Sequence, residues 1–224
     1  NTDVEVIVHL YEQMGLDFAK RLRGMFALAL WDKRKRRLVL CRDYAGIKPL
    51  YYYLDQNQLI FSSELKGIYS NNDIKLDINN QALVEYFYYA FIPGPKTIFK
   101  RCYKLNPGTV MTINQDKIIK ENPYWDIHSS EKDAISEVDL VQKVFDLTDQ
   151  SVKAHLVSDV PFGCFLSGGI DSSIVAAFMA RNMDQPVKTF SIGFENSEYN
   201  ELDKAAIVAN ALKTDHHAYV LSPD

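Results

Sequence analysis

A glycine-rich turn with several hydroxyl side chains is the segment of this chain best suited to chemistry. Its residues are Leu166-Ser167-Gly168-Gly169-Ile170-Asp171-Ser172-Ser173. An apolar run at 160–166 predicts a buried strand before it, and the run at 173–181 predicts a helix after it. Free backbone N–H groups and the helix dipole favour an anion at such a junction. Because Gly168 and Gly169 have no Cβ, the backbone can bend sharply and approach a phosphate closely.

The other side chains of the turn add polar groups. The serines supply hydroxyl donors, and Asp171 is placed to cap the helix or to reach a metal ion. No Gly-Lys-Ser/Thr follows the glycines, so this is not a Walker A loop. The hexamer Ser167–Ser172 resembles the pyrophosphate loop of the ATP pyrophosphatase family, which implies cleavage of ATP between its α- and β-phosphates to form an adenylate. The alternative is an ordinary strand-to-helix turn with two glycines.

Composition narrows the class of protein. The chain has 224 residues, of which 47% are hydrophobic, enough for one large domain or two small ones. A net charge of −4 gives no electrostatic case for nucleic acid. No apolar run reaches the ~18 residues of a membrane helix. Three cysteines, Cys41, Cys102 and Cys164, suit a reducing compartment better than a disulfide scaffold. We therefore expect a cytoplasmic protein with neither nucleic acid nor membrane as partner.

Two regions differ in their hydrophobic pattern. Residues 1–121 predict an amphipathic helix at the start, followed by short strands and hairpins, including a strand at Met25–Trp31 buried on both faces. Residues 122–135 are polar and marked by proline, which predicts a linker. Residues 136–224 alternate helices and strands, which predicts a parallel sheet with helices on its faces. The elements expected there are a helix at 138–156, strands at 160–166, 187–194 and 218–221, and helices at 173–181 and 201–212.

Further motifs occur in an order that resembles one enzyme family. They are Thr2–Ile7, Leu22–Asp32, Arg42–Tyr52, Ser63–Lys66, Leu105–Gly108, Tyr124-Trp125 and Ser158–Pro161. The first region resembles the class II, N-terminal-nucleophile glutaminase domain, and the second resembles the ATP pyrophosphatase domain. Together they are similar to glutamine-hydrolysing asparagine synthetase. The resemblance implies part of an αββα sandwich followed by part of a doubly wound parallel α/β domain.

The resemblance also implies roles for particular residues. An Asp at the position of Asp3 binds the α-amino group of glutamine in the family, and a carboxylate is the natural partner of an ammonium group. Asp3 also suits an N-cap of the first helix, and both roles are compatible. Leu166 and Ile192 match positions whose backbone meets the adenine of ATP. The residues that match the loop holding pyrophosphate and Mg²⁺ are Ser167, Gly168, Gly169, Asp171 and Ser172.

Both ends of the chain are expected to be cut. The family's nucleophile is an N-terminal Cys whose α-amino group acts as the base, and it would precede Asn1. None of the three cysteines can replace it, and we interpret them as core or strand residues. The rest of the synthetase site, including the acceptor-binding residues, would follow Asp224. We therefore expect no catalytic residue within this chain and no turnover by the chain alone.

Weaker patterns have simpler interpretations. The basic run Lys33–Arg37 predicts a solvated hairpin turn rather than a nucleic-acid patch. Adjacent histidines in Asp215-His216-His217 would point to opposite faces of a strand, so they make poor joint metal ligands. Tyr51–Tyr53 and Tyr86–Tyr89 are explained by strand and helix packing rather than base stacking.

The function implied is asparagine synthesis from aspartate, glutamine and ATP, with Mg²⁺, through a β-aspartyl adenylate that ammonia attacks. One alternative keeps the fold and changes the acceptor to a sugar or an antibiotic precursor, as in β-lactam synthetase, although Asp3 favours a working glutaminase. Another is a module that only binds nucleotide. Enzymes of the GMP or NAD synthetase type are disfavoured by the glutaminase motifs. The sequence gives no oligomeric state; the family is often dimeric, so a homodimer stays open.

Overall fold

The chain forms two compact units, Asn1–Ser129 and Ser130–Asp224. The structure, a computed structural model, describes residues 2–114, 119–127, 135–194 and 200–222. The elements of the first unit are α1 (Glu5–Met14), the 3₁₀ helix η1 (Gly15–Arg21), β1 (Ala27–Asp32), β2 (Arg37–Arg42), β3 (Tyr51–Leu54), β4 (Leu59–Ser62), α2 (Leu65–Tyr69), α3 (Asn80–Tyr89), β5 (Cys102–Lys104), β6 (Thr109–Asn114) and β7 (Ile119–Pro123). Those of the second are α4 (Glu137–His155), β8 (Gly163–Phe165), α5 (Ile170–Asn182), β9 (Lys188–Phe194), α6 (Leu202–Leu212) and β10 (Asp215–Leu221).

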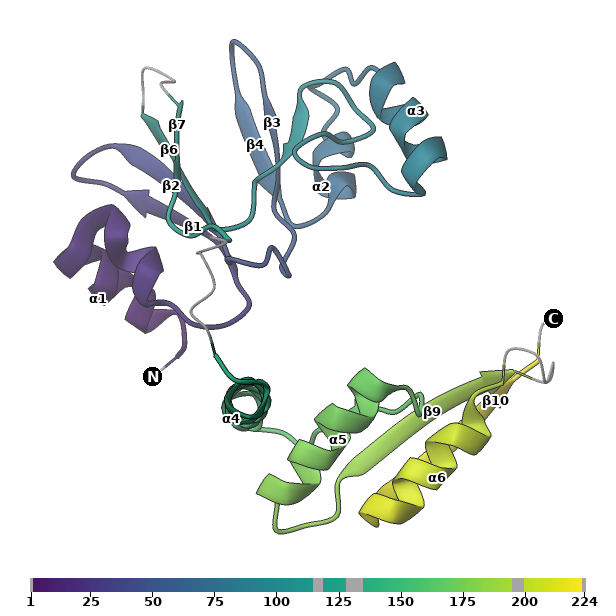
Figure 1. Ribbon diagram of the computed structural model, residues 1–224. Coiled ribbons are helices and arrows are strands. Elements are labelled where there is room, and N and C mark those ends of the chain that lie inside the picture. The colour runs from purple at the N-terminus through teal and green to yellow at the C-terminus, as the bar shows by residue number, and fades with distance from the viewer. Residues whose placement is uncertain (1, 115–118, 128–134, 195–199, 223–224) are drawn as a thin grey trace. The chain divides into compact units, whose positions relative to one another are not determined.

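The first unit is built on two antiparallel sheets that pack face to face. Their strand orders are β1-β2-β6-β7 and β4-β3-β5 (Figure 1). Leu40 of the first sheet and Tyr52 of the second meet in one apolar core. Side chains alternate across a strand, so Val39 and Cys41 face the other way and pack against Tyr11 of α1.

The outer face of the second sheet is covered by α2. Tyr53 of β3 and Cys102 of β5 pack there against Ile68, and all three are buried. The layers therefore run helix, sheet, sheet, helix. This confirms the αββα sandwich expected for the first unit.

The hairpins of the first unit follow the sequence pattern, with one exception. β1 and β2 pair antiparallel out to Asp32↔Arg37, and residues 33–36 form the exposed turn, so the hairpin interpretation of the basic run is confirmed. The prediction that Met25–Trp31 is buried on both faces is wrong. β1 lies at the end of its sheet in the described part of the chain, and Trp31 is 53% exposed. An apolar run alone does not distinguish a central strand from an end strand.

The end of the first unit overlaps the segment predicted as a linker. β6 and β7 form the predicted hairpin, and their register runs to Thr109↔Pro123. Asn122 and Pro123 therefore belong to a strand. Residues 115–118 of the predicted hairpin and residues 128–134 of the predicted linker lie outside the described residues.

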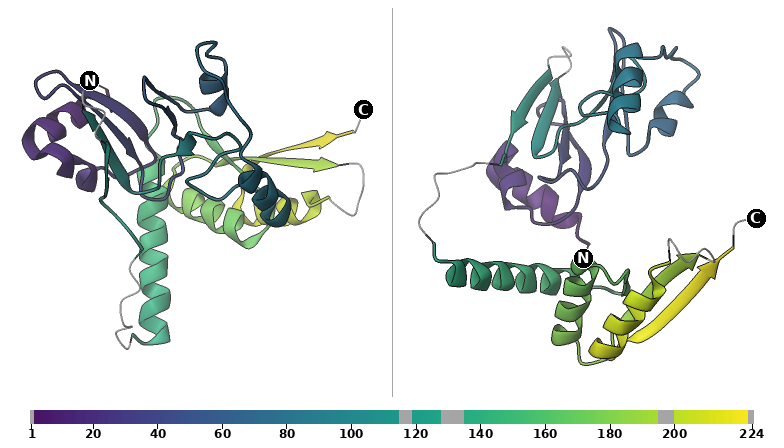
Figure 2. Two further views of the ribbon diagram at one scale, coloured as in Figure 1. Left: turned by 90° about the horizontal axis from the view of Figure 1, so that it is seen from above. Right: turned by 45° about the vertical axis from the view of Figure 1, so that its right-hand side comes forward.

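The second unit is a parallel sheet with strand order β10-β9-β8. α5 joins β8 to β9, and α6 joins β9 to β10 (Figure 1 and Figure 2). Leu166, Ala176 and Ala205 form a core shared by the sheet and both helices. Parallel neighbours need such crossover connections, and the α/β class predicted for this unit is confirmed.

β8 is shorter than the predicted strand at 160–166. Ser158 Oγ accepts a hydrogen bond from the backbone N–H of Val160 at 3.2 Å and lies 2.9 Å from the Val160 carbonyl oxygen, to which it donates. Pro161 then follows, and it has no N–H for a sheet ladder. The local turn and the proline together delay the strand until Gly163.

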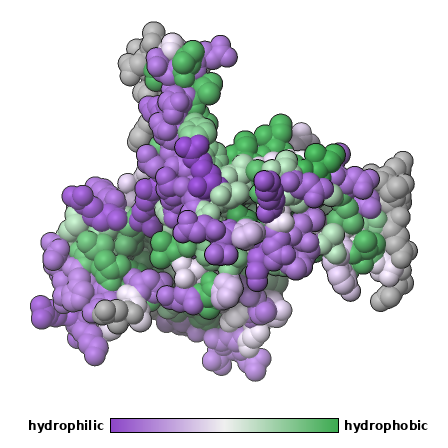
Figure 3. Space-filling model, turned by 90° about the horizontal axis from the view of Figure 1, so that it is seen from below, coloured by the Kyte–Doolittle hydropathy of each residue, from purple (hydrophilic) through white to green (hydrophobic). Residues whose placement is uncertain are grey.

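Large apolar side chains are exposed on both units. On α3, Phe87 is 79% and Tyr88 80% exposed, so the prediction that helix packing explains Tyr86–Tyr89 is wrong within the described residues. Tyr52 and Tyr53 are buried, as predicted for strand packing. Figure 3 shows hydrophobic patches among hydrophilic atoms on one face of the molecule. Within the described ranges, none of the helices combines the length and apolarity needed to cross a bilayer.

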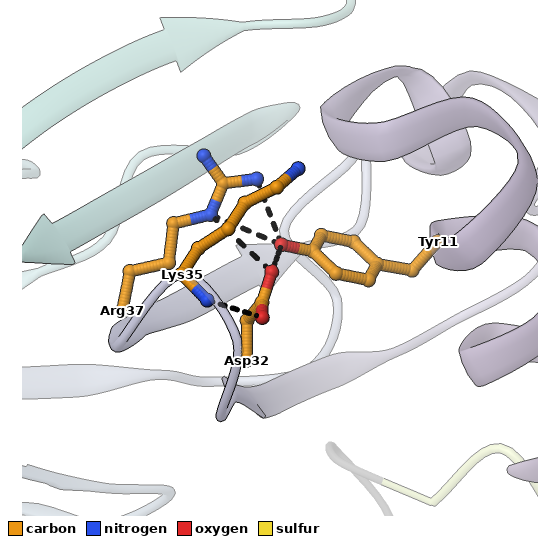
Figure 4. Close-up of polar contacts among 4 residues, drawn as sticks. All are labelled: Tyr11, Asp32, Lys35 and Arg37. Atoms are coloured by element: carbon orange, nitrogen blue, oxygen red, sulfur yellow. Dashed lines mark hydrogen bonds and ion pairs between the residues drawn. The ribbon is translucent and has the colours of Figure 1, made fainter.

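Polar contacts join α1 to the β1–β2 hairpin (Figure 4). The Tyr11 hydroxyl donates to Asp32 Oδ2 at 2.6 Å and accepts from Arg37 Nη2 at 2.7 Å. The Lys35 backbone N–H donates to Asp32 Oδ1 at 2.9 Å. The hydrogen bond from Tyr11, followed by that from Lys35, lowers the pKa of Asp32. Burial, and then the carboxylate beside it, raises the pKa of Tyr11.

Candidate functional site

The glycine-rich turn leaves the sheet at a firmly held point. Leu166 is 1% exposed, and its N–H donates to the Phe190 carbonyl at 2.8 Å. Its own carbonyl accepts a hydrogen bond from the Ser191 hydroxyl. The turn therefore starts at the carboxyl end of β8, the edge of a parallel sheet where ligands commonly bind.

Hydroxyl groups close the turn on itself. Ser167 Oγ lies 3.0 Å from Ser172 Oγ, and the Ser167 N–H donates to Ser172 Oγ at 3.3 Å. The Gly169 N–H donates to Ser167 Oγ at 3.3 Å. These distances are at the long end for hydrogen bonds, and the groups are exposed. The same donors can therefore turn to an incoming anion.

Gly168 is required by both conformation and space. Its φ is +77°, and a Cβ there would lie 2.5 Å from the Lys204 carbonyl carbon and 2.6 Å from the Ala205 nitrogen of α6. Gly169 has an ordinary φ of −73°, and a Cβ there would approach only Ser167 Oγ, at 3.3 Å. Gly168 thus lets the turn lie against α6, which no other residue type would allow without displacement.

Asp171 lies in the first turn of α5 but does not cap it. The helix begins at Ile170, three residues before the predicted start, and its N-cap is Gly169 without a side-chain cap. The capping interpretation of Asp171 is therefore wrong. No hydrogen bond or ion pair engages its carboxylate within the described residues, and it is exposed. A free carboxylate beside a helix N-terminus and a hydroxyl-lined turn suits a hydrated cation carried by a phosphate ligand.

A cleft of about 130 Å³ opens beside the turn. It is lined by Phe165, Leu166, Ser167, Phe190, Ser191, Ile192, Glu201 and Leu202. The structure thus brings together Leu166, Ser167 and Ile192, which the sequence analysis singled out from two different strands. The volume of the cleft is below the roughly 300–1,000 Å³ of a full ligand pocket, so the cleft suits one end of a nucleotide-sized molecule.

Glu201 and Leu202 were not expected in this cleft. Glu201 is the N-cap of α6 and Leu202 is its first residue, so both follow the carboxyl end of β9. Because the carboxyl ends of parallel strands meet at one edge of the sheet, the predicted topology already indicated that these two residues lie near the glycine-rich turn. Leu202 packs against Gly193 of β9, and only glycine leaves room for it, because a Cβ on Gly193 would lie 2.5 Å from Leu202 Cδ1.

Asp3 belongs to the first unit, whereas the glycine-rich turn belongs to the second. It is exposed and lies in the turn before α1. The N-cap of α1 is Val4, with no side-chain cap, so the capping interpretation of Asp3 is wrong. In the described part of the chain no hydrogen bond or ion pair engages its carboxylate.

The two adjacent histidines diverge, as predicted. His216 Nδ1 lies 2.9 Å from Thr189 Oγ1 on the helix-covered face of the sheet. His217 stacks on Phe190 on the other face, with ring centroids 5.3 Å apart, and its Nε2 lies 3.3 Å from Asp215 Oδ1. No group of three potential metal-ligating side chains occurs in the described ranges.

Two of the cysteines are structural. Cys41 and Cys102 are fully buried in the cores of the first unit. Burial raises the pKa of the Cys41 thiol to about 12 and that of Cys102 to about 11. Neither thiol is ionised near neutral pH, so neither is poised as a nucleophile.

Two family models match the chain in succession. One, described as a glutamine amidotransferase domain, matches residues 1–125, and the other, described as asparagine synthase, matches residues 143–224. The first match covers more than half of the chain, so the chain belongs to the glutamine amidotransferase family. The resemblance to glutamine-hydrolysing asparagine synthetase is confirmed by this pair of matches and by the relatives.

Curated relatives carry that more particular description. A putative glutamine-hydrolysing asparagine synthetase of Methanocaldococcus jannaschii is 41% identical over 97% of this chain and 43% of its own length. Asparagine synthetase 1 of Bacillus subtilis is 39% identical over 100% of this chain and 35% of its own length. The amidase chyE of Penicillium rubens is 33% identical over 96% of this chain and 34% of its own length. The chain thus spans less than half the length of these relatives.

Proposed function

We propose that the protein carrying this chain is a glutamine-hydrolysing asparagine synthetase, a carbon–nitrogen ligase. Glutamine would supply ammonia, and aspartate would be activated by ATP as a β-aspartyl adenylate. Attack of ammonia on the activated carbonyl carbon would release AMP and give asparagine, after pyrophosphate has left. The two matched domains, in this order along one chain, support a coupling of glutamine hydrolysis to adenylation.

The observation that carries the proposal is the construction of the glycine-rich turn. It begins at a buried, hydrogen-bonded Leu166, reverses at a glycine with positive φ, and ends in the first turn of α5. Its exposed N–H groups and hydroxyls point to an anion-binding turn. We assign the pyrophosphate of ATP to Ser167, Gly168, Gly169 and Ser172, where these donors would stabilise charge developing on the leaving group.

Asp171 fits a magnesium ion bound together with the nucleotide. Mg²⁺ is usually held by one or two carboxylates, by phosphate oxygens and by water, and Asp171 supplies a carboxylate free of partners among the described residues. The ion would neutralise phosphate charge. Asp171 would orient it from the first turn of α5.

The remaining assignments concern the adenine of ATP and the α-amino group of glutamine. The backbone at Leu166 and Ile192 would meet adenine, because both residues line the cleft beside the turn. Asp3 would bind the α-amino group of glutamine, since its carboxylate is exposed and unpaired within the described contacts.

A second reading keeps the fold and replaces the acceptor. The similarity to chyE, which is named an amidase and not an asparagine synthetase, favours it. A module that binds nucleotide without turnover is a third reading. Product analysis separates them, because only the first gives asparagine.

Three organisational points belong to the same proposal. We place the glutaminase part in the first unit through the end of β7 at Pro123, the linker after that strand, and the synthetase part at 136–224. We also propose a cytoplasmic location and assembly as a homodimer. Light scattering of the purified protein tests the dimer, and a monomer would contradict it.

The test of the function is a comparison of nitrogen donors in the intact protein. With aspartate, ATP and Mg²⁺, either glutamine or ammonium should yield asparagine, AMP and pyrophosphate by mass spectrometry. Asp3→Asn should abolish the glutamine-dependent reaction and leave the ammonium-dependent one. Asp171→Asn should reduce both. A protein that forms no asparagine with either donor would contradict the proposal.

A further inference from the structure

Glu201 is the one charged side chain that lines the cleft beside the glycine-rich turn in the described part of the chain. It precedes α6 as its N-cap residue, and its side chain makes no cap hydrogen bond. No described residue forms a hydrogen bond or ion pair with its carboxylate, and it is exposed. An acceptor without partners on the wall of a cleft is available to a ligand that carries hydrogen-bond donors.

The position of α6 defines which part of a nucleotide Glu201 would meet. The backbone of Lys204 lies so close to Gly168 that a Cβ there would come within 2.5 Å. Two residues earlier, Leu202 lies against Gly193 of β9, where a Cβ on Gly193 would come within 2.5 Å of Leu202 Cδ1. The first turn of α6 therefore runs from the proposed phosphate-binding turn to the cleft, and Glu201 lies at the cleft end.

The other walls of the cleft differ in character. Phe165, Phe190 and Ile192 present exposed apolar surface suited to the flat faces of a base. Ser167 belongs to the anion-binding turn. A carboxylate with no bridging cation repels phosphates, and Glu201 lies at the cleft end of α6, so we do not assign it to the pyrophosphate. Ribose connects base to phosphates, and its hydroxyls are donors that a carboxylate accepts well.

We propose that Glu201 is a specificity residue that accepts hydrogen bonds from the ribose hydroxyls of the nucleotide, selecting ribonucleotides over deoxyribonucleotides. This inference rests on the proposed nucleotide site and adds the group that recognises the sugar. Removing a ligand hydroxyl would leave the carboxylate without its donor, which costs affinity.

The experiment is calorimetric binding of Mg²⁺-ATP, Mg²⁺-2′-deoxy-ATP and Mg²⁺-3′-deoxy-ATP to the protein. Unmodified protein should bind at least one deoxy analogue about tenfold more weakly than ATP. Glu201→Ala should weaken ATP binding and bring the ratio of dissociation constants close to one. Glu201→Gln keeps an acceptor oxygen and should retain part of the discrimination. Thermal unfolding confirms that each variant is folded.

Asp203→Ala is the matched control. It removes an exposed carboxylate from the same helical turn, two residues along, that does not line the cleft. It should keep the discrimination of the unmodified protein, which excludes a general charge effect. If Glu201→Ala keeps that discrimination, or instead loses discrimination between ATP and inosine triphosphate, the ribose assignment is overturned and the nucleotide site stands. If the unmodified protein binds no nucleotide, both fail.

Discussion

Two charged side chains at a loop of the first unit and two carboxylates beside the cleft of the second differ in their partners. In the first, Arg42 donates to the carbonyls of Lys48 at 2.9 Å, Leu105 at 2.6 Å and Gly46 at 2.6 Å. Asp43, 1% exposed, accepts from the N–H groups of Ile47 and Lys48, each at 2.9 Å. In the second, Asp171 and Glu201 have no such partners among the described residues.

This difference separates charged side chains that hold the loops in place from charged side chains that are available to bind a ligand. A buried or half-buried charge that several backbone groups engage fixes the loops around it, and removing it leaves those backbone groups without their partner. A charge that is exposed beside a turn and a cleft, with no partner of its own, adds little to the folded state. It is available to a ligand. The contrast predicts where substitutions change stability and where they change affinity.

The largest stability effect is expected at Arg42. Arg42→Ala removes three charge-assisted hydrogen bonds and should lower the free energy of unfolding by about 3 kcal/mol. Urea denaturation followed by fluorescence measures it. Arg34→Ala, at an exposed position of the hairpin turn, should change stability by no more than about 0.5 kcal/mol. Equal effects of the two would show that Arg42 does not hold the loop.

The two neighbouring glycines of the turn should respond differently. Gly168→Ala adds a Cβ against the backbone of α6 at positive φ, and should cost about 2 kcal/mol and weaken ATP binding. Gly169→Ala has room and ordinary φ, so stability should change by less than about 1 kcal/mol. Thermal unfolding of both variants compares them. Equal tolerance would contradict the close approach of the turn to α6.

Aspartates of the two units provide a matched pair. Asp43→Asn weakens two charge-assisted hydrogen bonds from backbone and should destabilise the protein by about 2 kcal/mol. Asp171→Asn should change stability by no more than about 0.5 kcal/mol. Denaturant titrations of both variants measure the difference. A reversal of their order would remove the distinction between the two units.

A smaller effect is expected from pH at the contact between α1 and the hairpin. The native pKa of Asp32 is lowered, chiefly by the hydrogen bond from Tyr11. Its stabilising contribution is therefore present above the unfolded pKa, about 3.9, and is lost as pH falls through the native pKa. The stability difference between the unmodified protein and Asp32→Asn should shrink from pH 5 to pH 2. A difference that stays constant would show that the contact does not perturb Asp32.

The layered fold could be predicted from the sequence wherever the alternation of apolar side chains or the order of strands and helices within one segment determines it. Alternation in Val39, Leu40 and Cys41 assigns one side to the helix and the other to the facing sheet. The β–α–β order after residue 160 gives the parallel sheet. The ends of two elements differ from the pattern: Pro161 shortens β8, and α5 starts at Ile170, with Gly169 as its N-cap.

What could not be predicted depends on tertiary contacts. Trp31 lies in an apolar run, but its exposure depends on which tertiary neighbours cover its face of β1, a strand at the end of its sheet in the described part of the chain. The aromatic residues of α3 are apolar without being covered. Glu201 lacks a motif of its own, and it enters the cleft only because α6 packs on Gly168 and Gly193.

The central claim is that the glycine-rich turn binds the phosphates of ATP, with Asp171 serving the ligand rather than the fold. Calorimetric titration of Mg²⁺-ATP into the unmodified protein and into Asp171→Ala tests it directly, with thermal unfolding of both. We predict binding by the unmodified protein, loss of binding in the variant, and unchanged unfolding temperatures. Equal binding by the two proteins, or no binding by either, would contradict the account.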